Sequence, residues 1–529
     1  MGTPRTVAAG DRAVTLVLGD TLDLEVSARV RALDRDLADR PFAGLVESVP
    51  AAGSLLVVFD PSVQSAEAVA GLLRERCAQA LPPPPAGRRH EIPVRYGGDD
   101  GPDLAAAARH LGLTEKELID RHGATEYTTL MLGFTPGFGY LGPVPDELSL
   151  PRLETPRARV PAGSVALAGP FTGVYPSASA GGWNLIGRAA PSFLDWTQDP
   201  PGLLAAGDRV RFVASDALPA AAPTAVAASD RGEPAAEVLD GGPLTTVQDL
   251  GRPGYRRAGI ARAGAMDVEA LTLANVAVGN TPGAAALECT LAGPSLRFVR
   301  GVVFAVAGAD LGAVLWRRDL GRWVVPAGAA VRARPGNVLS FEGRRRGCRA
   351  YIAFAGGIEV PVVLGSRSTD VGAGFGGLAG RGLRAGDVLR VGGGRPFELP
   401  REMAARCRHE TADDAVVELR VVPGPQADCL EPESLADWLG AECQVAAEAD
   451  RAGVRLRGPG LRHRGRADVL SDGMPMGSIQ VPPDGQPIVM AAEGPTTGGY
   501  VKPLVVLSAD LPKLGQLVPG ASRVRFRPA

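Results

Sequence analysis

The sequence lacks long apolar runs and carries almost no net charge. No stretch approaches the roughly 18 to 20 apolar residues that a membrane-spanning helix requires, and the chain opens without the basic-then-apolar pattern of a signal peptide. The formal net charge is −2 over 529 residues, which removes any electrostatic argument for binding nucleic acid or a membrane surface. We therefore expect a cytoplasmic protein with neither kind of partner.

Cysteines are few and scattered. No Cys-x-x-Cys pair is present, and no histidine stands at ligand spacing from a cysteine. The pattern predicts reduced structural thiols and no metal site. The six cysteines are Cys77, Cys289, Cys348, Cys407, Cys429 and Cys443.

Familiar nucleotide-binding and hydrolase motifs are also absent. There is no Gly-x-x-x-x-Gly-Lys-Ser/Thr loop, no serine nucleophile elbow and no His-Glu-x-x-His pair. Residues Gly372–Gly377 imitate a dinucleotide fingerprint. We set that interpretation aside because no clear strand precedes them and no helix follows.

The chain is long enough for several domains, roughly three or four by length alone. A β-α-β-β-α order over residues 12–78 predicts a small split βαβ domain at 1–85, ending in a stiff proline-rich linker at 81–87. A loop-rich β unit is expected at 86–216, and an interdomain linker rich in Ala, Pro and Ser at 217–235. Beyond that linker, short strands between Gly and Pro predict an all-β architecture of barrels or sandwiches.

A weak internal repeat accompanies this organisation. Residues Gly207–Phe212, Gly386–Val391 and Gly520–Phe526 each place a turn before a strand near the end of an expected module. Such pieces also arise by chance, so the repeat alone leaves shared ancestry and coincidence both open.

Glycine, proline and aromatic residues alternate between Leu132 and Gly187, too densely for a helix and too regularly for disorder. Gly permits positive φ, Pro fixes φ, and aromatic rings supply packing area. We expect shaped loops on a β scaffold, which is where function is often found. The aromatic residues are Phe134, Phe138, Tyr140, Tyr175 and Trp183.

His122 is the first candidate for chemistry. It stands at the end of a predicted helix, just ahead of the glycine-aromatic segment, where it could act as an acid or base or bind a ligand. A histidine that simply interacts with the helix dipole explains the same position.

A second candidate lies in glycine-rich turns after residue 245. Asp249, Arg252 and Asp267, with Asn275 further on, could bind a carboxylate, a phosphate or an amide. A turn-stabilising Asp–Arg pair is an equally good explanation.

Two further candidates lie near the end of the chain. One is Arg451 with Arg455. The other is the segment Gly477–Pro487 together with Thr496–Tyr500 and Lys502, whose hydroxyls and flexible amides suit an oxyanion or phosphate. A tight hairpin would account for the latter equally well.

Specific motifs then indicate a family. In the first half they are Phe134–Leu141, Pro151-Arg152, Pro156-Arg157, Val160–Val165, Thr172–Pro176 and Gly181–Trp183. Through them, residues 12–213 resemble allophanate hydrolase subunit 1, also called the Kip inhibitor or the B-type component of 5-oxoprolinase. In the second half they are Gln248–Gly254, Gly264–Asp267, Ala274-Asn275, Ala355–Ile358, Leu364–Thr369, Ile479–Pro483 and Thr496–Tyr500. Through these, residues 236–527 resemble allophanate hydrolase subunit 2, also called the Kip antagonist or the C-type component of 5-oxoprolinase.

The resemblance implies a fusion of the two subunits through the 217–235 linker. It implies a mainly β fold with a small α/β N-terminal domain and several cyclophilin-like β-barrels. One barrel is expected at 86–216 and two more at 236–400 and 401–529. Repeated barrels thereby become the favoured explanation of the internal repeat.

The resemblance also implies an activity. The first expectation is the B and C components of an ATP-dependent 5-oxoprolinase, which open 5-oxo-L-proline to L-glutamate with a separate A-type subunit. ATP would be a co-substrate of that complex, and a homo-oligomer is possible.

Two alternatives stay open. One is the carboxyltransferase component of a biotin-dependent urea carboxylase, although the biotin attachment motif Ala-Met-Lys-Met is missing, so no biotin is expected on this chain. The other is a Kip-type regulator of a histidine kinase, against which the fusion of inhibitor-like and antagonist-like halves argues.

Site residues follow from the same resemblance. Asp249, Arg252, Asp267 and His122 are the expected catalytic groups. Arg367 and Arg451 are expected to clamp an anion. The other expected substrate contacts are Phe134, Phe138, Tyr140, Gln480, Thr496, Thr497 and Tyr500.

Two departures from the family pattern bear on these expectations. Pro143-Val144 stands where a further Gly-Leu is usual, and Glu493-Gly494-Pro495 stands where Asp-Arg-Gln is common. Loss of that arginine predicts altered anion binding or substrate choice.

Overall fold

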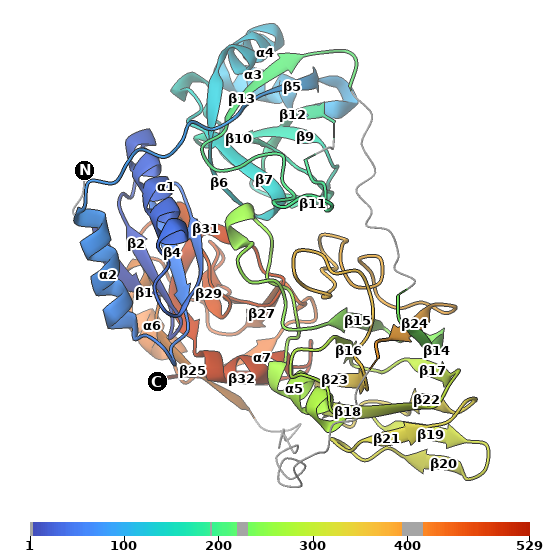
Figure 1. The fold of residues 1–529 in the computed structure, drawn as a ribbon. Coiled ribbons are helices and arrows are strands. Elements are labelled where there is room, and N and C mark those ends of the chain that lie inside the picture. Colours follow the sequence, from blue (N-terminus) through green and yellow to red (C-terminus); the bar gives the residue numbers. More distant parts are fainter. Residues whose placement is uncertain (1–3, 191–192, 219–230, 394–415) are drawn as a thin grey trace.

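The computed structural model describes residues 4–190, 193–218, 231–393 and 416–529 (Figure 1). Most of the expected linker at 217–235 lies outside the described residues, as does Cys407. The other five cysteines are free thiols. Within the described part of the chain, no helix is long and apolar enough to cross a membrane.

Residues 5–78 form a small α/β unit whose four antiparallel strands lie in the order β1-β2-β4-β3. Val30, Leu33 and Leu37 recur at helical spacing on α1 and pack in the core that the helices share with the sheet. The order β-α-β-β-α is present, with one more strand ahead of it. The elements are β1 (Arg5–Ala8), β2 (Ala13–Val17), α1 (Leu24–Asp39), β3 (Leu45–Pro50), β4 (Ser54–Phe59) and α2 (Ala66–Ala78).

Residues 89–214 close into a barrel of seven strands in the order β10-β7-β6-β13-β5-β12-β9. The last strand, β13, runs parallel to β5 and antiparallel to β6. Asp208 holds this closure, because its carboxylate accepts hydrogen bonds from the backbone N–H of Arg88 (2.8 Å) and of Ala205 (3.0 Å). The elements are β5 (Arg89–Tyr96), α3 (Leu104–Leu111), α4 (Glu115–Ala124), β6 (Glu126–Gly133), β7 (Thr135–Gly142), β8 (Arg157–Val160), β9 (Ser164–Ala168), β10 (Phe171–Val174), β11 (Ser179–Gly181), β12 (Asn184–Ala189) and β13 (Arg209–Ala214).

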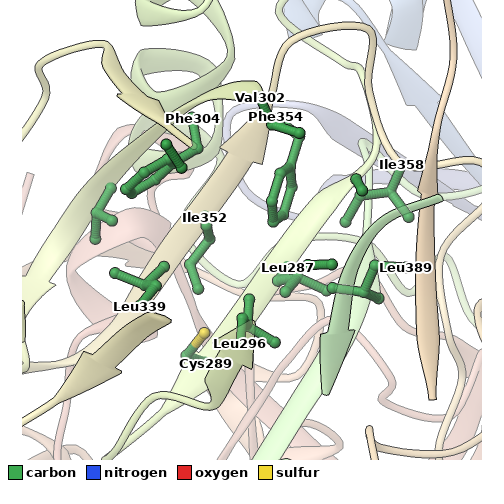
Figure 2. Packing of buried hydrophobic residues seen from close by; sticks show 14 of the residues in the cluster. Leu287, Cys289, Leu296, Val302, Phe304, Leu339, Ile352, Phe354, Ile358 and Leu389 are labelled. Atoms are coloured by element: carbon green, nitrogen blue, oxygen red, sulfur yellow. The ribbon is translucent and has the colours of Figure 1, made fainter. Parts of the chain in front are cut away.

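Residues 233–391 form two facing sheets, of six strands (β20-β19-β22-β17-β14-β24) and five strands (β15-β16-β23-β18-β21). Phe304, Ile352 and Phe354 fill the space between them with residues such as Leu296 and Leu389 (Figure 2). The elements are β14 (Glu233–Asp240), β15 (Leu244–Gln248), α5 (Val268–Ala277), β16 (Ala286–Thr290), β17 (Ser295–Phe298), β18 (Val302–Asp310), β19 (Ala313–Arg317), β20 (Gly321–Val324), β21 (Val331–Ala333), β22 (Val338–Phe341), β23 (Arg346–Phe354) and β24 (Val388–Val391).

Among the residues that the structure describes, the two sheets do not join into a closed barrel, because β15 is an edge strand of its sheet. Its backbone is paired with the loop that follows β23, since the N–H of Thr369 donates to the carbonyl of Val247 (2.9 Å) and that of Leu383 to Thr245 (2.8 Å). The loop therefore occupies the edge at which a neighbouring strand would close the barrel. It also carries the charged residues described below.

Residues 417–528 form a second closed barrel, because β25 pairs with both β32 and β31. Trp438 stacks on Phe526 in its core, with ring centroids 4.7 Å apart. An eighth strand, β28, lies on β31. The elements are β25 (Val417–Pro423), α6 (Pro432–Trp438), β26 (Glu442–Val445), β27 (Gly453–Arg457), β28 (Asp468–Gly473), β29 (Ser478–Val481), β30 (Ile488–Met490), β31 (Thr497–Val506), α7 (Leu511–Gly515) and β32 (Arg523–Pro528).

The internal repeat seen in the sequence has a structural counterpart. Gly207–Phe212 leads into β13 and Gly520–Phe526 leads into β32, and each of these strands runs parallel to the first strand of its own barrel. Gly386–Val391 leads into β24, which instead pairs antiparallel with β14. The two closed barrels thus end in the same way, whereas the pair of sheets does not.

Candidate functional site

Three loops of the second half meet, and we call this place the loop junction. It comprises residues 249–252 after β15, 366–375 after β23, and 491–496 before β31. The backbone of Arg252 donates to Arg262 (2.8 Å), and the backbone of Ala263 donates to Ala492 (2.9 Å). Residues 262 and 263 thus link the first of these loops to the last, so the middle sheets and the second barrel position the site together.

Asp249 organises the junction. Its Oδ1 accepts hydrogen bonds from the hydroxyls of Ser366 (2.6 Å) and Ser368 (2.5 Å) and from the backbone of Gly251 (2.7 Å), and its Oδ2 accepts from the backbone of Arg367 (2.6 Å). Both oxygens are therefore occupied within the protein. This is a geometry that fixes two loops to each other.

Arg252 is completely buried within the junction. One of its terminal nitrogens donates to the carbonyl of Ser368, and its guanidinium carbon lies 4.5 Å from the ring centroid of Phe375. On a third element, Trp196 of the first half stacks on Phe375, with centroids 3.7 Å apart. Nε and Nη1 of Arg252 have no hydrogen-bond partner among the described residues. Such groups are normally satisfied by water or a ligand.

Asp370 is the titratable group of the junction. It is 3% exposed, and Oδ1 accepts from the backbone of Ala373 (2.9 Å). Burial, followed by the negative charge of Glu493, raises the pKa of Asp370 to about 7, against the opposing effect of Arg252 and Arg451. A carboxyl group with this pKa exchanges its proton near neutral pH, which is what a general acid or base requires.

Arg451 joins the second barrel to the middle sheets. Its nitrogens donate to Glu493 (2.5 Å), to Glu288 and to the carbonyl of Gly264 (2.6 Å). Burial alone would lower the pKa of Arg451, but Glu288 and Glu493 outweigh that effect and raise it. Glu493, one of the departures from the family pattern, thus forms a buried ion pair here.

Two other expected site residues are held by neighbours in the protein. Asp267 caps α5, since Oδ1 accepts from the backbone of Ala270 (2.9 Å), and Oδ2 accepts from the side chain of Gln516 (2.7 Å). Arg367 donates to Glu359 (2.7 Å). Neither contributes an unpaired group to the loop junction.

Of the expected site residues near β31, Thr496 has a hydroxyl that is unpaired within the described part of the chain, whereas Thr497 and Lys502 contact other parts of the protein. The Thr496 hydroxyl is buried without a hydrogen-bond partner among the described residues, close to Glu493 in the chain. Thr497 donates to the carbonyl of Leu132 in the first barrel (3.4 Å), and so joins the halves. Further along, Lys502 is fully buried beside Asp472.

Gln480 and Tyr500 lie on the second barrel. Gln480 belongs to β29 and is 7% exposed, and Tyr500 belongs to β31 and is half-buried. A Cβ added to Gly498 would come within 2.4 Å of the Gln480 amide nitrogen, so glycine leaves the room that this amide occupies. Both side chains remain expected substrate contacts.

His122 lies in the core of the first barrel, fully buried and stacked on Phe212 with centroids 4.6 Å apart. Thr172 donates to the carbonyl of Ala166, so its oxygen accepts from Nε2 of His122 (2.9 Å), which leaves Nδ1 to accept from the hydroxyl of Tyr96 (2.8 Å). Burial lowers the pKa of His122 to about 3. The ring is therefore neutral, and all of these partners belong to the first barrel.

The aromatic residues of the glycine-rich segment form one cluster. Phe138 lies at its centre, with edge contacts to Phe134, Tyr140, Tyr175 and Trp183 at centroid distances of 5.5, 5.1, 5.2 and 5.3 Å. Phe134 is the most exposed member, at 37%. The cluster also includes Ala51 and Ala52 of the N-terminal unit, so it connects that unit to the barrel.

Sequence reasoning missed Asp370 and Phe375 of the junction, and also Trp196, which stacks on Phe375 from the first half. The available signal was the glycine-rich stretch Gly372–Gly377, which resembles a nucleotide fingerprint but places Gly376 against Arg252. A Cβ at Gly376 would lie 2.2 Å from the carbonyl oxygen of Ser368 and 3.0 Å from Arg252 Nη2. Gly376 is thus required for close packing beside Arg252, whereas a Cβ at Gly374 would meet nothing within 4 Å.

The fold and the junction define a class of β proteins in which closed barrels and a pair of sheets carry a buried, charged site between loops. The family model described as the carboxyltransferase domain, subdomain A and B, matches residues 258–528. The model for subdomain C and D matches residues 4–204. The chain belongs to this carboxyltransferase-domain family.

Individual relatives match each half. The first half is 44% identical over 211 residues to the B component of 5-oxoprolinase from Escherichia coli O157:H7, covering 40% of this chain and 95% of the relative. The second half is 36% identical over 281 residues to the C component of 5-oxoprolinase from Escherichia coli K12, covering 53% of this chain and 87% of the relative. The crystal structure of TTHA0988 matches 97% of this chain and 99% of its own, with a TM-score of 0.84 and 37% identity.

Proposed function

We propose that this chain combines the B and C components of an ATP-dependent 5-oxoprolinase and works with a separate A-type subunit to hydrolyse 5-oxo-L-proline to L-glutamate. The supporting observation is that relatives named as the B and C components of 5-oxoprolinase match consecutive parts of one chain, over 40% and 53% of its length. A fusion keeps two components at a fixed ratio and in permanent contact.

The chemistry of the loop junction supports this proposal. Opening a lactam adds water to its carbonyl carbon, breaks the C–N bond and returns a proton to the nitrogen, while negative charge develops on the carbonyl oxygen. Nε and Nη1 of Arg252 supply unpaired donors for that charge. Asp370, with a pKa of about 7, supplies an exchangeable proton for the leaving nitrogen.

Asp249 and Arg451 take supporting roles in this proposal. Asp249 holds the loop that carries Arg252, and Arg451 holds Glu493, whose charge raises the pKa of Asp370. ATP is assigned to the whole complex as its co-substrate, because Gly376 of the glycine-rich stretch is packed against Arg252 and Ser368.

The test is to mix the purified chain with an A-type subunit, ATP and 5-oxo-L-proline, and to measure glutamate and ADP. We expect both products, and we expect Asp370→Asn to lower the rate of glutamate formation by about 10²-fold, since general acid–base catalysis contributes roughly that much or more. The matched control is Asp319→Asn, which changes an exposed carboxylate in the β19–β20 turn. Absence of glutamate from the wild-type mixture would contradict the proposal.

A second function is supported by the family match itself, since both models are named for a carboxyltransferase domain. In this case the chain would pass a carboxyl group from carboxybiotin on a separate carrier to urea. The two assays distinguish the functions, and Asp370→Asn tests whether the loop junction is responsible for either. Carboxyl transfer to urea that depends on Asp370, without any glutamate in the first assay, would replace the lactam proposal.

A further inference from the structure

A second group of charged side chains lines a cavity of about 90 Å³ where the N-terminal unit meets the second half. Arg12 and Glu47 come from the N-terminal unit, and Arg256 and Arg262 come from the segment between β15 and α5. Figure 1 shows the N-terminal unit beside the second barrel, which contributes the remaining wall. That wall is largely apolar and includes Met474, Met476, Met490 and Val505.

Arg256 is the buried arginine of this group, since Arg12 and Arg262 are exposed to solvent. It is 8% exposed, and its guanidinium makes no hydrogen bond to any residue that the structure describes. The carboxylate of Glu47 lies 3.9 Å from its Nη1, beyond hydrogen-bond reach, and the other Glu47 oxygen accepts from the backbone of Gly254 (2.9 Å). The ion pair with Glu47 partly compensates the charge of Arg256, and its N–H groups remain available to water or to a ligand.

The charged side chains of the cavity wall also favour a bound anion. The wall carries two carboxylates, Glu47 and Asp11, and three arginines, of which Arg12 and Arg262 are also exposed to solvent. Asp11 is already engaged, since its oxygens accept from the backbone and hydroxyl of Ser508. Burial lowers the pKa of Arg256, Glu47 opposes that shift, and the neighbouring charge of Arg262 adds to it.

The size of the cavity fits such an anion. One water molecule needs roughly 10 to 15 Å³ of this kind of volume, so about 90 Å³ accommodates a small ion or several waters. Arginine is suited to carboxylates and phosphates because its planar N–H groups match their oxygens. The methionine-rich wall favours an anion with a small carbon skeleton.

We propose that this cavity is a binding site for a small oxyanion, held by Arg256 together with Arg12 and Arg262. Its charged side chains differ from those of the loop junction, and the site does not depend on the lactam chemistry proposed above. The shared ligand chemistry is a carboxylate or phosphate group, and a small organic carboxylate fits the apolar wall better.

The test is isothermal titration calorimetry on the full chain alone, with propionate and with inorganic phosphate as separate probes. We expect one saturable site per chain for propionate. Arg256→Gln is expected to weaken binding at least about tenfold, because it removes charge-assisted hydrogen bonds. Arg300→Gln, an exposed arginine beside Glu233, is the matched control and is expected to bind as the wild type does.

Glu47→Gln is the decisive second variant. It removes the competing negative charge while its amide oxygen can still accept from Gly254, so we expect tighter binding of the anion by several-fold. A damaged fold would weaken binding instead, so the direction of the change separates loss of the Glu47 charge from loss of the fold. Saturable binding of phosphate that depends on Arg256 would support the site and identify phosphate as the preferred oxyanion. Absence of saturable binding of both probes, or unchanged affinity in both variants, would overturn the proposal.

Discussion

Buried charge at the residue scale is concentrated where loops of different units meet. Four charged side chains of the loop junction and its surroundings are almost fully buried: those of Arg252, Asp370, Glu493 and Arg451. Removing charges from water is unfavourable unless partners compensate. Arg451 and Glu493 compensate each other, whereas Asp370 shifts its pKa and Arg252 retains unpaired N–H groups.

Asp370 makes stability depend on pH. Its folded pKa of about 7 lies above the unfolded value of about 3.9, so the folded state binds more protons between these values and stability falls as the pH rises through that range. Asp370→Asn removes this loss. We expect the variant to raise the Tm relative to the wild type more at pH 8 than at pH 5, as measured by differential scanning calorimetry. An equal offset at both pH values would contradict the assigned pKa.

His122 makes stability depend on pH in the opposite direction. Its folded pKa of about 3 lies below the unfolded value of about 6.5, so its stabilising contribution is complete above pH 6.5 and is lost as the pH falls toward 3. We expect its ring to remain neutral from pH 5 to pH 8. Nitrogen NMR shifts of labelled imidazole measure this directly, and a charged ring near pH 6 would show that the barrel core is open to protons.

The important elements are loops rather than helices or strands. The loop after β23 pairs with the edge of β15, carries Asp370, and places Phe375 between Arg252 and Trp196. One segment therefore closes a sheet edge, contacts the first half and supplies the titratable group. Its glycines allow backbone and side chains to approach closely.

Two glycines of this loop provide a matched pair of variants. Gly374 and Gly376 have nearly the same φ, 71° and 70°, so alanine strains the backbone similarly at both. A Cβ meets nothing within 4 Å at Gly374, but at Gly376 it would clash with Ser368 and approach Arg252. We expect Gly376→Ala to abolish activity and lower the Tm well beyond Gly374→Ala. Equal effects would show that backbone strain alone is responsible.

Contacts between the halves are polar as well as apolar at the scale of the whole molecule. Asp34 pairs with Arg257, and Asp11 accepts from Ser508. Thr497 donates to Leu132 in the first barrel. These contacts join the part of the chain that is similar to a B subunit to the part that is similar to a C subunit.

A break in the chain between residues 218 and 231 tests these contacts. We expect the two fragments, produced together, to co-purify as a one-to-one complex, because the buried contacts do not require the covalent connection. Arg257→Glu places like charges together and is expected to weaken association at least about tenfold, measured by surface plasmon resonance. Arg300→Glu, which lies outside these contacts, is the control. Fragments that do not associate would show that the covalent link is essential.

Much of the architecture follows from local patterns. The α/β order of the first unit, the mainly β character of the rest and the closing strands at Gly207–Phe212 and Gly520–Phe526 reflect residue periodicity and turn chemistry, which act over short stretches of chain. The glycine-aromatic segment likewise forms packed strands and turns in the first barrel.

The site depends on contacts between distant residues, which no local pattern specifies. Asp249 was expected in the site, and the structure shows that it holds the loops together; Asp267 caps a helix. Asp370 resembles any aspartate before a glycine-rich turn until Glu493, about 120 positions later in the chain, comes close enough to raise its pKa.

The sequence by itself determined the family, the strand-rich fold and the segments that bear polar groups, because these depend on composition and short-range order. Only the tertiary structure decided which buried polar groups stay without a hydrogen bond after folding; among the residues that the structure describes, these include two nitrogens of Arg252 and the hydroxyl of Thr496. The physical reason is that hydrogen-bond satisfaction and desolvation depend on every neighbour in space, and most of those neighbours are remote in the chain.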